Sequence, residues 1–195
     1  MISAVILAAG QSRRMGRPKI NLPWGPTTVI GQVIASLLEA GVEDVVAVTG
    51  KVQIQGINLK VFPSVHCVYN PLAESGEMLS SLQVGLANLP ADCQAVLIAL
   101  GDQPQMESQV VKKILEAYHK DQPKIIIPSY QMRRGHPWLI SKALWPEVLA
   151  MSAPKTLRDL VHQHSGEIHY LNIESPSVLM DLDTPQDYEK YRPKL

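Results

Sequence analysis

Short apolar runs alternate with amphipathic stretches along most of the chain. The continuous β-prone runs are typical of strands buried on both faces, and they span Ile2–Leu7, Asp44–Thr49, His66–Tyr69, Ala95–Leu100 and Lys124–Pro128. Between these runs, apolar residues recur at helical spacing and predict helices over Val29–Leu38, Met78–Leu89 and Ser108–His119. Thr28 is suited to cap the first helix and Gly41 to end it. This strand–helix–strand order predicts an α/β domain with a mainly parallel sheet.

The alternation of apolar runs and amphipathic stretches becomes less regular after Ser129, where the apolar runs are shorter. A turn is expected at Gln131–Gly135, and the pattern beyond it predicts strands over Pro137–Ile140, Ile168–Ile173 and Val178–Leu182. Short helices are expected over Ser141–Leu149, Thr156–His164 and Thr184–Tyr191. We expect residues 129–195 to finish one edge of the sheet and to cover a cleft at the carboxyl ends of the strands, where such sheets bind ligands.

The composition is that of a folded chain without a polyanionic partner. Of 195 residues, 46% are hydrophobic, which is ordinary for one domain with its own core. The 18 Lys and Arg balance the 18 Asp and Glu, and this absence of a basic surplus argues against nucleic acid and membrane surfaces as partners. The chain has no membrane-length apolar run, and its apolar start lacks the positive residues of a signal peptide. Cys67 and Cys93 stand far apart and predict two buried, reduced thiols in a cytoplasmic protein.

The loop after the first predicted strand carries the strongest chemical signal. It reads LAAGQSRRMGRPK from Leu7 to Lys19 and matches neither the G-x-x-x-x-G-K-[ST] phosphate loop nor G-x-G-x-x-G. Ser12 adds a hydroxyl, while Arg14 and Lys19 supply positive charge for phosphate oxygens. Small residues let the backbone approach a ligand and present its N–H groups to an anion; they are Ala8, Ala9, Gly10 and Gly16. The alternative, a solvated basic turn, is less favoured directly after a buried strand.

Two further segments place charge near the expected cleft. Asp102 follows the most apolar predicted strand within LGDQP, so it is expected at the carboxyl end of a central strand. Because Mg²⁺ prefers carboxylate and phosphate oxygens, Asp102 is a candidate metal ligand, with a simple Gly-Asp turn as the alternative. The segment RRGHP (Arg133–Pro137) groups positive charge suited to an anion, with an ordinary turn as the alternative for a His beside Gly and Pro.

The chain resembles the nucleotidyltransferases of the molybdenum cofactor cytidylyltransferase and guanylyltransferase type. The loop described above is similar to that family's signature, LAAGxSxRMGxPK. Further segments follow in the family's order, and they are NLPWG (Asn21–Gly25), GEMLSSLQVG (Gly76–Gly85), LGDQP (Leu100–Pro104), RRGHP (Arg133–Pro137) and LDTPQDY (Leu182–Tyr188). Because these segments occur in one order along nearly the whole chain, the resemblance is specific.

The resemblance implies a single nucleotidyltransferase domain over residues 1–195. Its fold would be Rossmann-like, with three layers, a mainly parallel sheet and a small C-terminal β/α extension that covers the cleft. Residues 1–128 would form the nucleotide-binding core, and residues 129–195 the acceptor-side and closing elements. The implied activity is Mg²⁺-dependent transfer of a nucleoside monophosphate from its triphosphate to the phosphate of an acceptor, with release of pyrophosphate.

The family's functional residues carry over to the matching positions of this chain. Arg14 and Lys19 would hold the triphosphate, and with Asp102 they are the candidate catalytic residues. The nucleotide-binding set would be Leu7, Ala8, Ala9, Gly10, Ser12, Arg14, Lys19, Ser80 and Ser81. For the two serines, a helix-capping role is the alternative. Asp102 and Asp183 would bind Mg²⁺, with Asp181 open as a further ligand. The acceptor would contact Arg133, Arg134 and His136.

Ala9 indicates which nucleotide base the chain would bind. The LAAG sequence of this chain resembles the cytidylyl branch of the family, whereas the guanylyl branch tends to carry LAGG. The leading hypothesis is therefore transfer of CMP from CTP to molybdopterin-type cofactor, with a molybdoenzyme or its maturation factor as a candidate protein partner. Three alternatives stay open at this point. They are guanylyl transfer, a sugar phosphate or other small molecule as acceptor, and a non-catalytic maturation factor that binds the cofactor.

Overall fold

The computed structural model describes residues 1–58, 62–75 and 78–194. Within these residues, the centre is an eight-stranded sheet whose main path runs β10-β7-β9-β6-β1-β4-β5, with β8 paired to β7. The strands are β1 (Ile2–Ala8), β4 (Asp44–Thr49), β5 (Val65–Tyr69), β6 (Ala95–Leu100), β7 (Ile125–Tyr130), β8 (Arg133–Arg134), β9 (Trp138–Ser141) and β10 (Ile168–Asn172). The pairings of β8 and β9 are antiparallel and the others parallel, which confirms the expected mainly parallel sheet.

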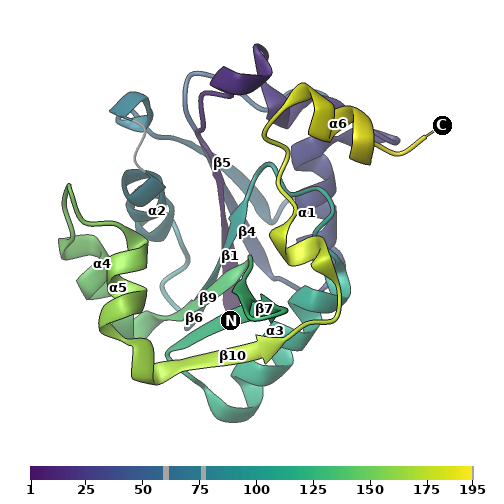
Figure 1. Ribbon diagram of the computed structural model, residues 1–195. Coiled ribbons are helices and arrows are strands. Elements are labelled where there is room, and N and C mark those ends of the chain that lie inside the picture. The colour runs from purple at the N-terminus through teal and green to yellow at the C-terminus, as the bar shows by residue number, and fades with distance from the viewer. Residues whose placement is uncertain (59–61, 76–77, 195) are drawn as a thin grey trace.

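Helices cover both faces of the sheet and make three layers (Figure 1). One face carries α1 (Val29–Glu39) and α3 (Ser108–Asp121), and the other carries α2 (Met78–Ala87), α4 (Trp145–Ala150) and α5 (Leu157–Gln163). A smaller cluster joins α6 (Pro185–Tyr191) to the two-stranded ribbon of β2 (Pro23–Trp24) and β3 (Thr27–Thr28). The three-layer α/β fold expected from the sequence is confirmed.

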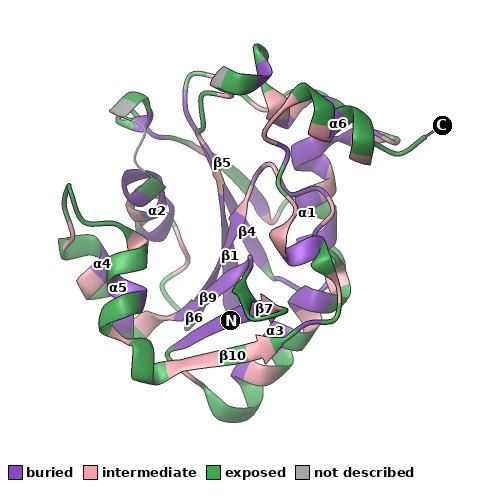
Figure 2. Cartoon of the chain, viewed as in Figure 1, coloured by how far each residue is buried: buried purple, intermediate pink, exposed green. Residues whose placement is uncertain are grey.

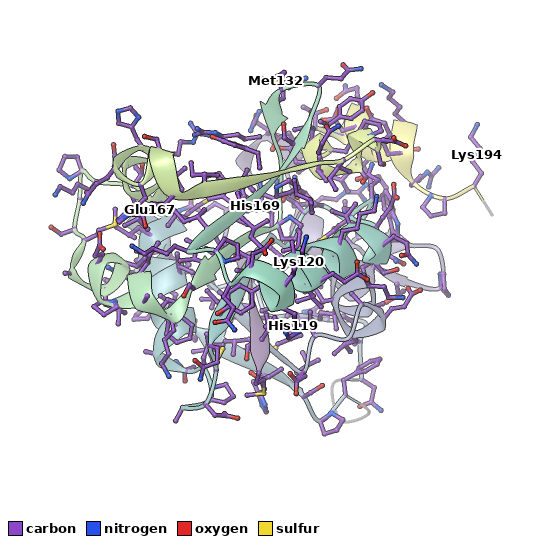
Figure 3. All side chains as sticks on the ribbon, turned by 90° about the horizontal axis from the view of Figure 1, so that it is seen from below. His119, Lys120, Met132, Glu167, His169 and Lys194 are labelled. Atoms are coloured by element: carbon purple, nitrogen blue, oxygen red, sulfur yellow. The ribbon has the colours of Figure 1, made fainter. Side chains whose placement is uncertain are left out.

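The apolar pattern explains how these layers pack. The central strands are buried along almost their whole length, since helices cover them on both sides (Figure 2). Each fully buried aliphatic side chain, such as Ile6 in β1, contributes about 1.5–3 kcal/mol of burial free energy. Figure 3 shows the polar side of α3, where His119 and Lys120 point to solvent. Thr28 caps α1 as expected, because its side chain accepts a hydrogen bond from the Gly31 N–H.

The C-terminal third enters the sheet instead of only bordering it. β10 forms the edge beside β7, but β9 is inserted between β7 and β6 and runs antiparallel to both. Trp138 of β9 pairs with Ile98 of β6. Because β9 runs in the opposite direction, the residues just before Trp138 lie at the carboxyl end of β6. This insertion brings the RRGHP segment to the edge where the loops after β1 and β6 emerge.

The expected strand over Val178–Leu182 is wrong. Residues Pro176–Leu179 form a short 3-10 helix. Its first residue is a proline, which has no N–H for a strand ladder, and the Ser175 hydroxyl accepts a hydrogen bond from the Ser177 N–H at 3.3 Å. Val178 of this stretch is buried in the apolar core and packs there from the short helix, which contacts β7, instead of pairing within the sheet, whereas Leu179 and Met180 are only partly buried.

Both cysteines are free, but only one is buried. Cys93 lies in the core, whereas Cys67 is exposed, so the expectation of two buried thiols is wrong for Cys67. The reason is its place on β5, the last strand of the sheet, whose side chains are mostly exposed. Among the described residues, no helix has the length and apolar character needed to span a membrane.

His164, directly after α5, links three elements on one side of the sheet. Its Nε2 lies 2.9 Å from Glu147 Oε2 of α4, and its Nδ1 lies 2.8 Å from Glu167 Oε1. Glu167, labelled in Figure 3, also pairs with Lys124. Hydrogen bonds to Glu147 and then to Glu167 raise the pKa of His164 above its ordinary 6.5.

This histidine should make stability depend on pH. A raised pKa in the folded state contributes stability that is complete below the unfolded value and is lost as pH rises through the folded value. We therefore expect the difference in Tm between wild type and His164→Gln to be larger at about pH 5.5 than at about pH 8.5. Circular dichroism melts at both pH values measure it, and an equal difference at both would contradict the assignment.

Candidate functional site

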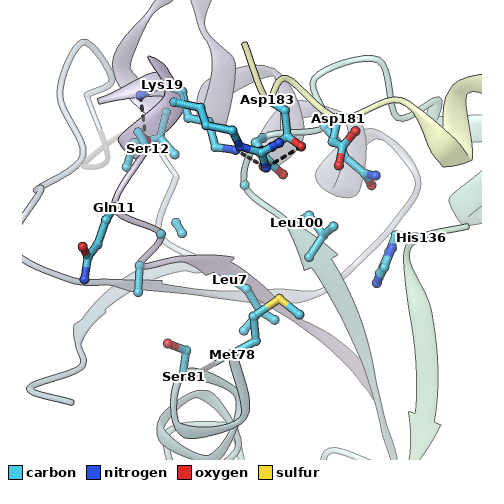
Figure 4. Close-up of a pocket in the computed structure, with 18 of the residues that line it drawn as sticks. Leu7, Gln11, Ser12, Lys19, Met78, Ser81, Leu100, His136, Asp181 and Asp183 are labelled. Atoms are coloured by element: carbon cyan, nitrogen blue, oxygen red, sulfur yellow. Dashed lines mark hydrogen bonds and ion pairs between the residues drawn. The ribbon is translucent and has the colours of Figure 1, made fainter. Parts of the chain in front are cut away.

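A cavity of about 860 Å³ opens at the carboxyl ends of β1 and β6 (Figure 4). Leu7 of β1 pairs in register with Leu100 of β6, so the loops after these strands begin side by side. The Gly101 N–H donates to the Leu7 carbonyl at 3.1 Å, and a Cβ on Gly101 would lie 3.2 Å from that oxygen. Glycine therefore suits this close approach of the two loops.

Every site residue predicted from the sequence lines this cavity except Ser80. The residues that do are Leu7, Ala8, Ala9, Gly10, Ser12, Arg14, Lys19, Ser81, Asp102, Arg133, Arg134, His136, Asp181 and Asp183. Asn70 donates hydrogen bonds from Nδ2 to the hydroxyls of Ser80 at 3.0 Å and Ser81 at 2.9 Å. Both serines lie inside α2, so neither caps a helix. Gly76 and Glu77, which begin the GEMLSSLQVG segment, lie outside the described residues.

The loop after β1 folds back over the cavity. Ser12 has φ 48° and Gly16 has φ 66°, both in the left-handed region. The Met15 N–H donates to the Ser12 carbonyl at 3.0 Å, and the Lys19 N–H donates to the Ser12 hydroxyl at 3.2 Å. These turns direct Lys19 over the strand ends, toward Asp183 (Figure 4).

Two cations and two carboxylates meet in the cavity. Lys19 Nζ donates a hydrogen bond to Asp102 Oδ2 and lies 3.4 Å from Asp183 Oδ1. Arg14 Nη2 lies 2.8 Å from Asp183 Oδ2. The side chain of Lys19 is 14% exposed and that of Asp102 is 19% exposed, against 70% for Arg14. Solvent and salt therefore screen the Lys19–Asp102 pair least, and its electrostatic coupling is the strongest of the three.

Asp181 adds a third carboxylate at the same edge. The Leu182 N–H donates to the Asp102 carbonyl at 3.0 Å, which holds residues 181–183 against the loop after β6. Burial, followed by the charges of Asp183 and Asp102, raises the pKa of Asp181 above its usual range. The negative charges of these carboxylates therefore lie close to the positive charges of Lys19 and Arg14, which offset them.

The carboxylates in the cavity suit a hard divalent cation whose remaining ligands are water molecules and substrate phosphates. Within the described part of the chain, no three His, Cys, Asp or Glu side chains are arranged to hold an ion by themselves. Mg²⁺ keeps several waters and commonly takes only one or two protein carboxylates together with substrate phosphates. Asp102 and Asp183, with their oxygens converging on Lys19 Nζ, match that requirement.

The opposite side of the cavity combines cations with a neutral imidazole. Burial first, and the charge of Arg158 second, lower the pKa of His136 to about 4, so its ring is uncharged at neutral pH. The ring stacks on Trp138 with 5.0 Å between centroids and 4° between planes. Its backbone N–H donates to the Val178 carbonyl at 2.9 Å. A Cβ on the preceding Gly135 would lie 2.5 Å from the same oxygen, so only glycine allows this approach.

Three residues near the site were missed in the sequence analysis. Arg158 of α5 also lines the cavity, near enough to His136 for its charge to act on that ring. Gln103, which directly follows Asp102, also lines it and is almost fully buried. Asn70, fully buried, holds the serines of α2. The place of Gln103 within LGDQP was a usable signal, whereas nothing local distinguishes Arg158 from an ordinary surface arginine.

Comparisons with known proteins find relatives over nearly the whole chain. The family model described as "MobA-like NTP transferase domain" matches residues 4–168. The chain is 27% identical over 192 residues to the molybdenum cofactor cytidylyltransferase of Escherichia coli K12, covering 96% of this chain and 93% of that protein. It is 27% identical over 203 residues to the molybdenum cofactor guanylyltransferase of Mesorhizobium japonicum, covering 95% and 92%. The crystal structure of Rv0371c from Mycobacterium tuberculosis H37Rv matches with a TM-score of 0.83 at 27% identity, over 97% of this chain and 96% of that one.

Proposed function

Because the chain belongs to the MobA-like NTP transferase domain family, we propose that it transfers CMP from CTP to the phosphate of a molybdopterin-type cofactor and releases pyrophosphate. One observation carries the proposal, namely the meeting of Lys19, Arg14, Asp102 and Asp183 in one cavity. This group offers two cations for a triphosphate and two carboxylates for the divalent cation that accompanies it. The relative from Escherichia coli is a cytidylyltransferase for this cofactor, which supports CTP as the donor.

The reaction needs no nucleophile–base pair from the protein. An oxygen of the acceptor phosphate, already ionised at neutral pH, forms a bond to the α-phosphorus of CTP. The bond from that phosphorus to the bridging oxygen breaks, and pyrophosphate leaves with its electron pair. The protein contributes by holding the two phosphates in line and by neutralising negative charge.

Lys19 and Arg14 supply the positive charge for this step. Lys19 neutralises Asp102 in the structure, and a cation bound at Asp102 would release its ammonium for the triphosphate oxygens. Arg14, largely exposed and paired with Asp183 in the structure, could pair with the leaving pyrophosphate once a cation occupies Asp183. A divalent cation held by Asp102 and Asp183 would supply additional positive charge at the phosphates.

The substrates would divide the cavity between them. The nucleotide is assigned to the loop after β1, over residues 7–12, and to Ser81 of α2, all within residues 1–128. The acceptor is assigned to Arg133, Arg134 and His136, to which we add Arg158. Because guanidinium groups pair well with phosphate oxygens, these arginines suit an anionic acceptor. A molybdoenzyme or its maturation factor is the proposed recipient of the product.

The decisive experiment measures pyrophosphate release with Mg²⁺ and freshly prepared molybdopterin cofactor, using CTP and GTP in separate reactions. Release with CTP alone supports the proposal. Release with neither nucleotide, despite nucleotide binding, contradicts it and favours either a sugar phosphate or other acceptor, or a maturation factor that binds without turnover.

Guanylyl transfer is the second candidate, because the relative from Mesorhizobium japonicum is a guanylyltransferase. Ala9 lines the cavity. We infer that the base lies against Ala9, where its methyl group would take up room that a purine needs. We expect Ala9→Gly to raise the ratio of kcat/KM for GTP to that for CTP by about tenfold, the usual discrimination by one methyl group. Parallel assays of pyrophosphate release measure the ratio, and an unchanged value would show that Ala9 does not select the base.

A further inference from the structure

Asn70 connects the end of β5 to the start of α2 through a side chain that is fully buried. Its Oδ1 accepts a hydrogen bond from the Leu72 N–H at 2.9 Å, and its Nδ2 donates to the hydroxyls of Ser80 at 3.0 Å and Ser81 at 2.9 Å. Its backbone N–H donates to the Thr49 carbonyl of β4 at 2.8 Å, which anchors the residue to the sheet. Both hydrogens of the Asn70 amide are therefore used on the two serines of α2.

These contacts fix the direction of the Ser81 hydroxyl. A backbone N–H can only donate, so the side-chain atom bonded to the Leu72 N–H must be the oxygen of Asn70, and the amide nitrogen must face the serines. An amide nitrogen can also only donate, so the Ser81 oxygen accepts this bond and its own O–H points elsewhere. Across residues 1–58, 62–75 and 78–194, Asn70 is the only hydrogen-bond partner of the Ser81 side chain. Asn70 thus leaves the Ser81 O–H available to a ligand.

Ser81 lines the cavity away from its cluster of charges. In Figure 4, Ser81 and Met78 lie at one end of the cavity and Lys19 and Asp183 at the other, and the Ser81 hydroxyl is turned toward the side of the loop after β1. Because the charged end suits a triphosphate, the base of a bound nucleotide would lie at the Ser81 end. Ser81 is only 3% exposed, so a hydrogen bond to a base would form there with little competition from water.

We propose that Asn70 is a positioning residue for the nucleotide, which by donating to Ser81 makes the serine hydroxyl a hydrogen-bond donor to the base. This end of the site would then recognise an acceptor atom, such as the ring carbonyl or the unprotonated ring nitrogen of cytosine. The inference rests on the proposed function, because it concerns the nucleotide of that same reaction. Asn70 itself does not line the cavity, so it would act on the ligand only through Ser81.

Asn70→Asp tests this by reversing the hydroxyl with little change in shape. Both carboxylate oxygens are acceptors, so one can keep the bond from the Leu72 N–H while the other draws the Ser81 O–H away from the cavity. We expect the Kd for CTP with Mg²⁺, measured by calorimetry, to rise about tenfold. GTP replaces CTP if wild type binds it more tightly. Inorganic tripolyphosphate, which has no base, should bind within about twofold of wild type.

A neutral variant and a matched control accompany this change. Asn70→Ser keeps an oxygen for the Leu72 N–H but loses both amide hydrogens, and it should weaken nucleotide binding about fivefold without affecting tripolyphosphate. Asn88→Asp makes the same substitution at the other end of α2, where the exposed Asn88 donates from Nδ2 to the Val84 carbonyl at 2.8 Å. It should change neither Kd. Equal weakening of nucleotide and tripolyphosphate by both Asn70 variants would indicate a structural role and overturn the inference.

A double-mutant cycle identifies Ser81 as the route. Ser81→Ala alone should raise the Kd for the nucleotide about tenfold, and adding Asn70→Asp should raise it less than about twofold further, because both changes remove the same hydrogen bond. If Asn70→Asp does not fold, Asn70→Ser takes its place in the cycle. Fully additive losses would overturn the inference, since Asn70 would then act by another route.

These binding measurements are independent of turnover. If wild type binds the nucleotide with the expected pattern among the variants but releases no pyrophosphate, the proposed function fails and the inference stands. If wild type releases pyrophosphate but Asn70→Asp and Asn70→Ser bind the nucleotide as wild type does, the inference fails and the proposed function stands. Wild type that binds neither CTP nor GTP overturns both.

Discussion

Replacing Asp102 by asparagine is expected to lower kcat for nucleotidyl transfer by about 10³-fold. The change removes one negative charge that would hold the cation, and charge stabilisation of this kind is worth several kcal/mol in the transition state. Asparagine keeps the size of the side chain and the backbone carbonyl that accepts from Leu182. Pyrophosphate release at saturating CTP and cofactor measures the effect.

The same variant should keep its fold, since Asp102 belongs to the cavity and not to the apolar core. Its far-ultraviolet circular dichroism spectrum is expected to match that of wild type. Asp92→Asn is the matched control, because Asp92 lies exposed in the turn before β6 and should retain full turnover. Wild-type kcat in Asp102→Asn would contradict the assignment of Asp102 to the metal.

Replacing Lys19 by methionine is expected to lower kcat by about 10²–10³-fold, which is the usual loss when one preorganised partner of a developing negative charge is removed. Methionine retains most of the apolar stem of a side chain that is only 14% exposed. It also leaves Asp102 without its ion-pair partner. Binding of Mn²⁺ in the absence of nucleotide, followed by electron paramagnetic resonance, should therefore be tighter in Lys19→Met than in wild type.

These two readouts move in opposite directions, which a general loss of structure cannot produce. Lys120→Met is the matched control, because Lys120 points to solvent from α3 (Figure 3) and should alter neither value. Unchanged turnover in Lys19→Met would remove Lys19 from the reaction. Lower turnover together with weaker Mn²⁺ binding would indicate a disturbed site, and would contradict the pairing with Asp102 as its cause.

The sequence alone determined the α/β class and most of the elements, because buried strands and amphipathic helices are local patterns. The predicted strands Asp44–Thr49 and Ala95–Leu100 match the structure at both ends. The same reading placed the loop after β1 and Asp102 at strand ends, where parallel sheets bind ligands. Each of these conclusions depends on residues that are close together in the chain.

Only the tertiary structure decided which distant residues meet. The insertion of β9 beside β6 depends on pairing between strands far apart in sequence, and it is what brings His136 to the cavity. The pairing of Lys19 with Asp102 and Asp183 and the arrival of Arg158 from α5 follow from the same long-range contacts. No local periodicity encodes them, because they arise when whole elements pack and bury surface together. The expected strand near Val178 is wrong for the same reason, since a short helix packed against a sheet and a strand within the sheet can show the same short apolar run.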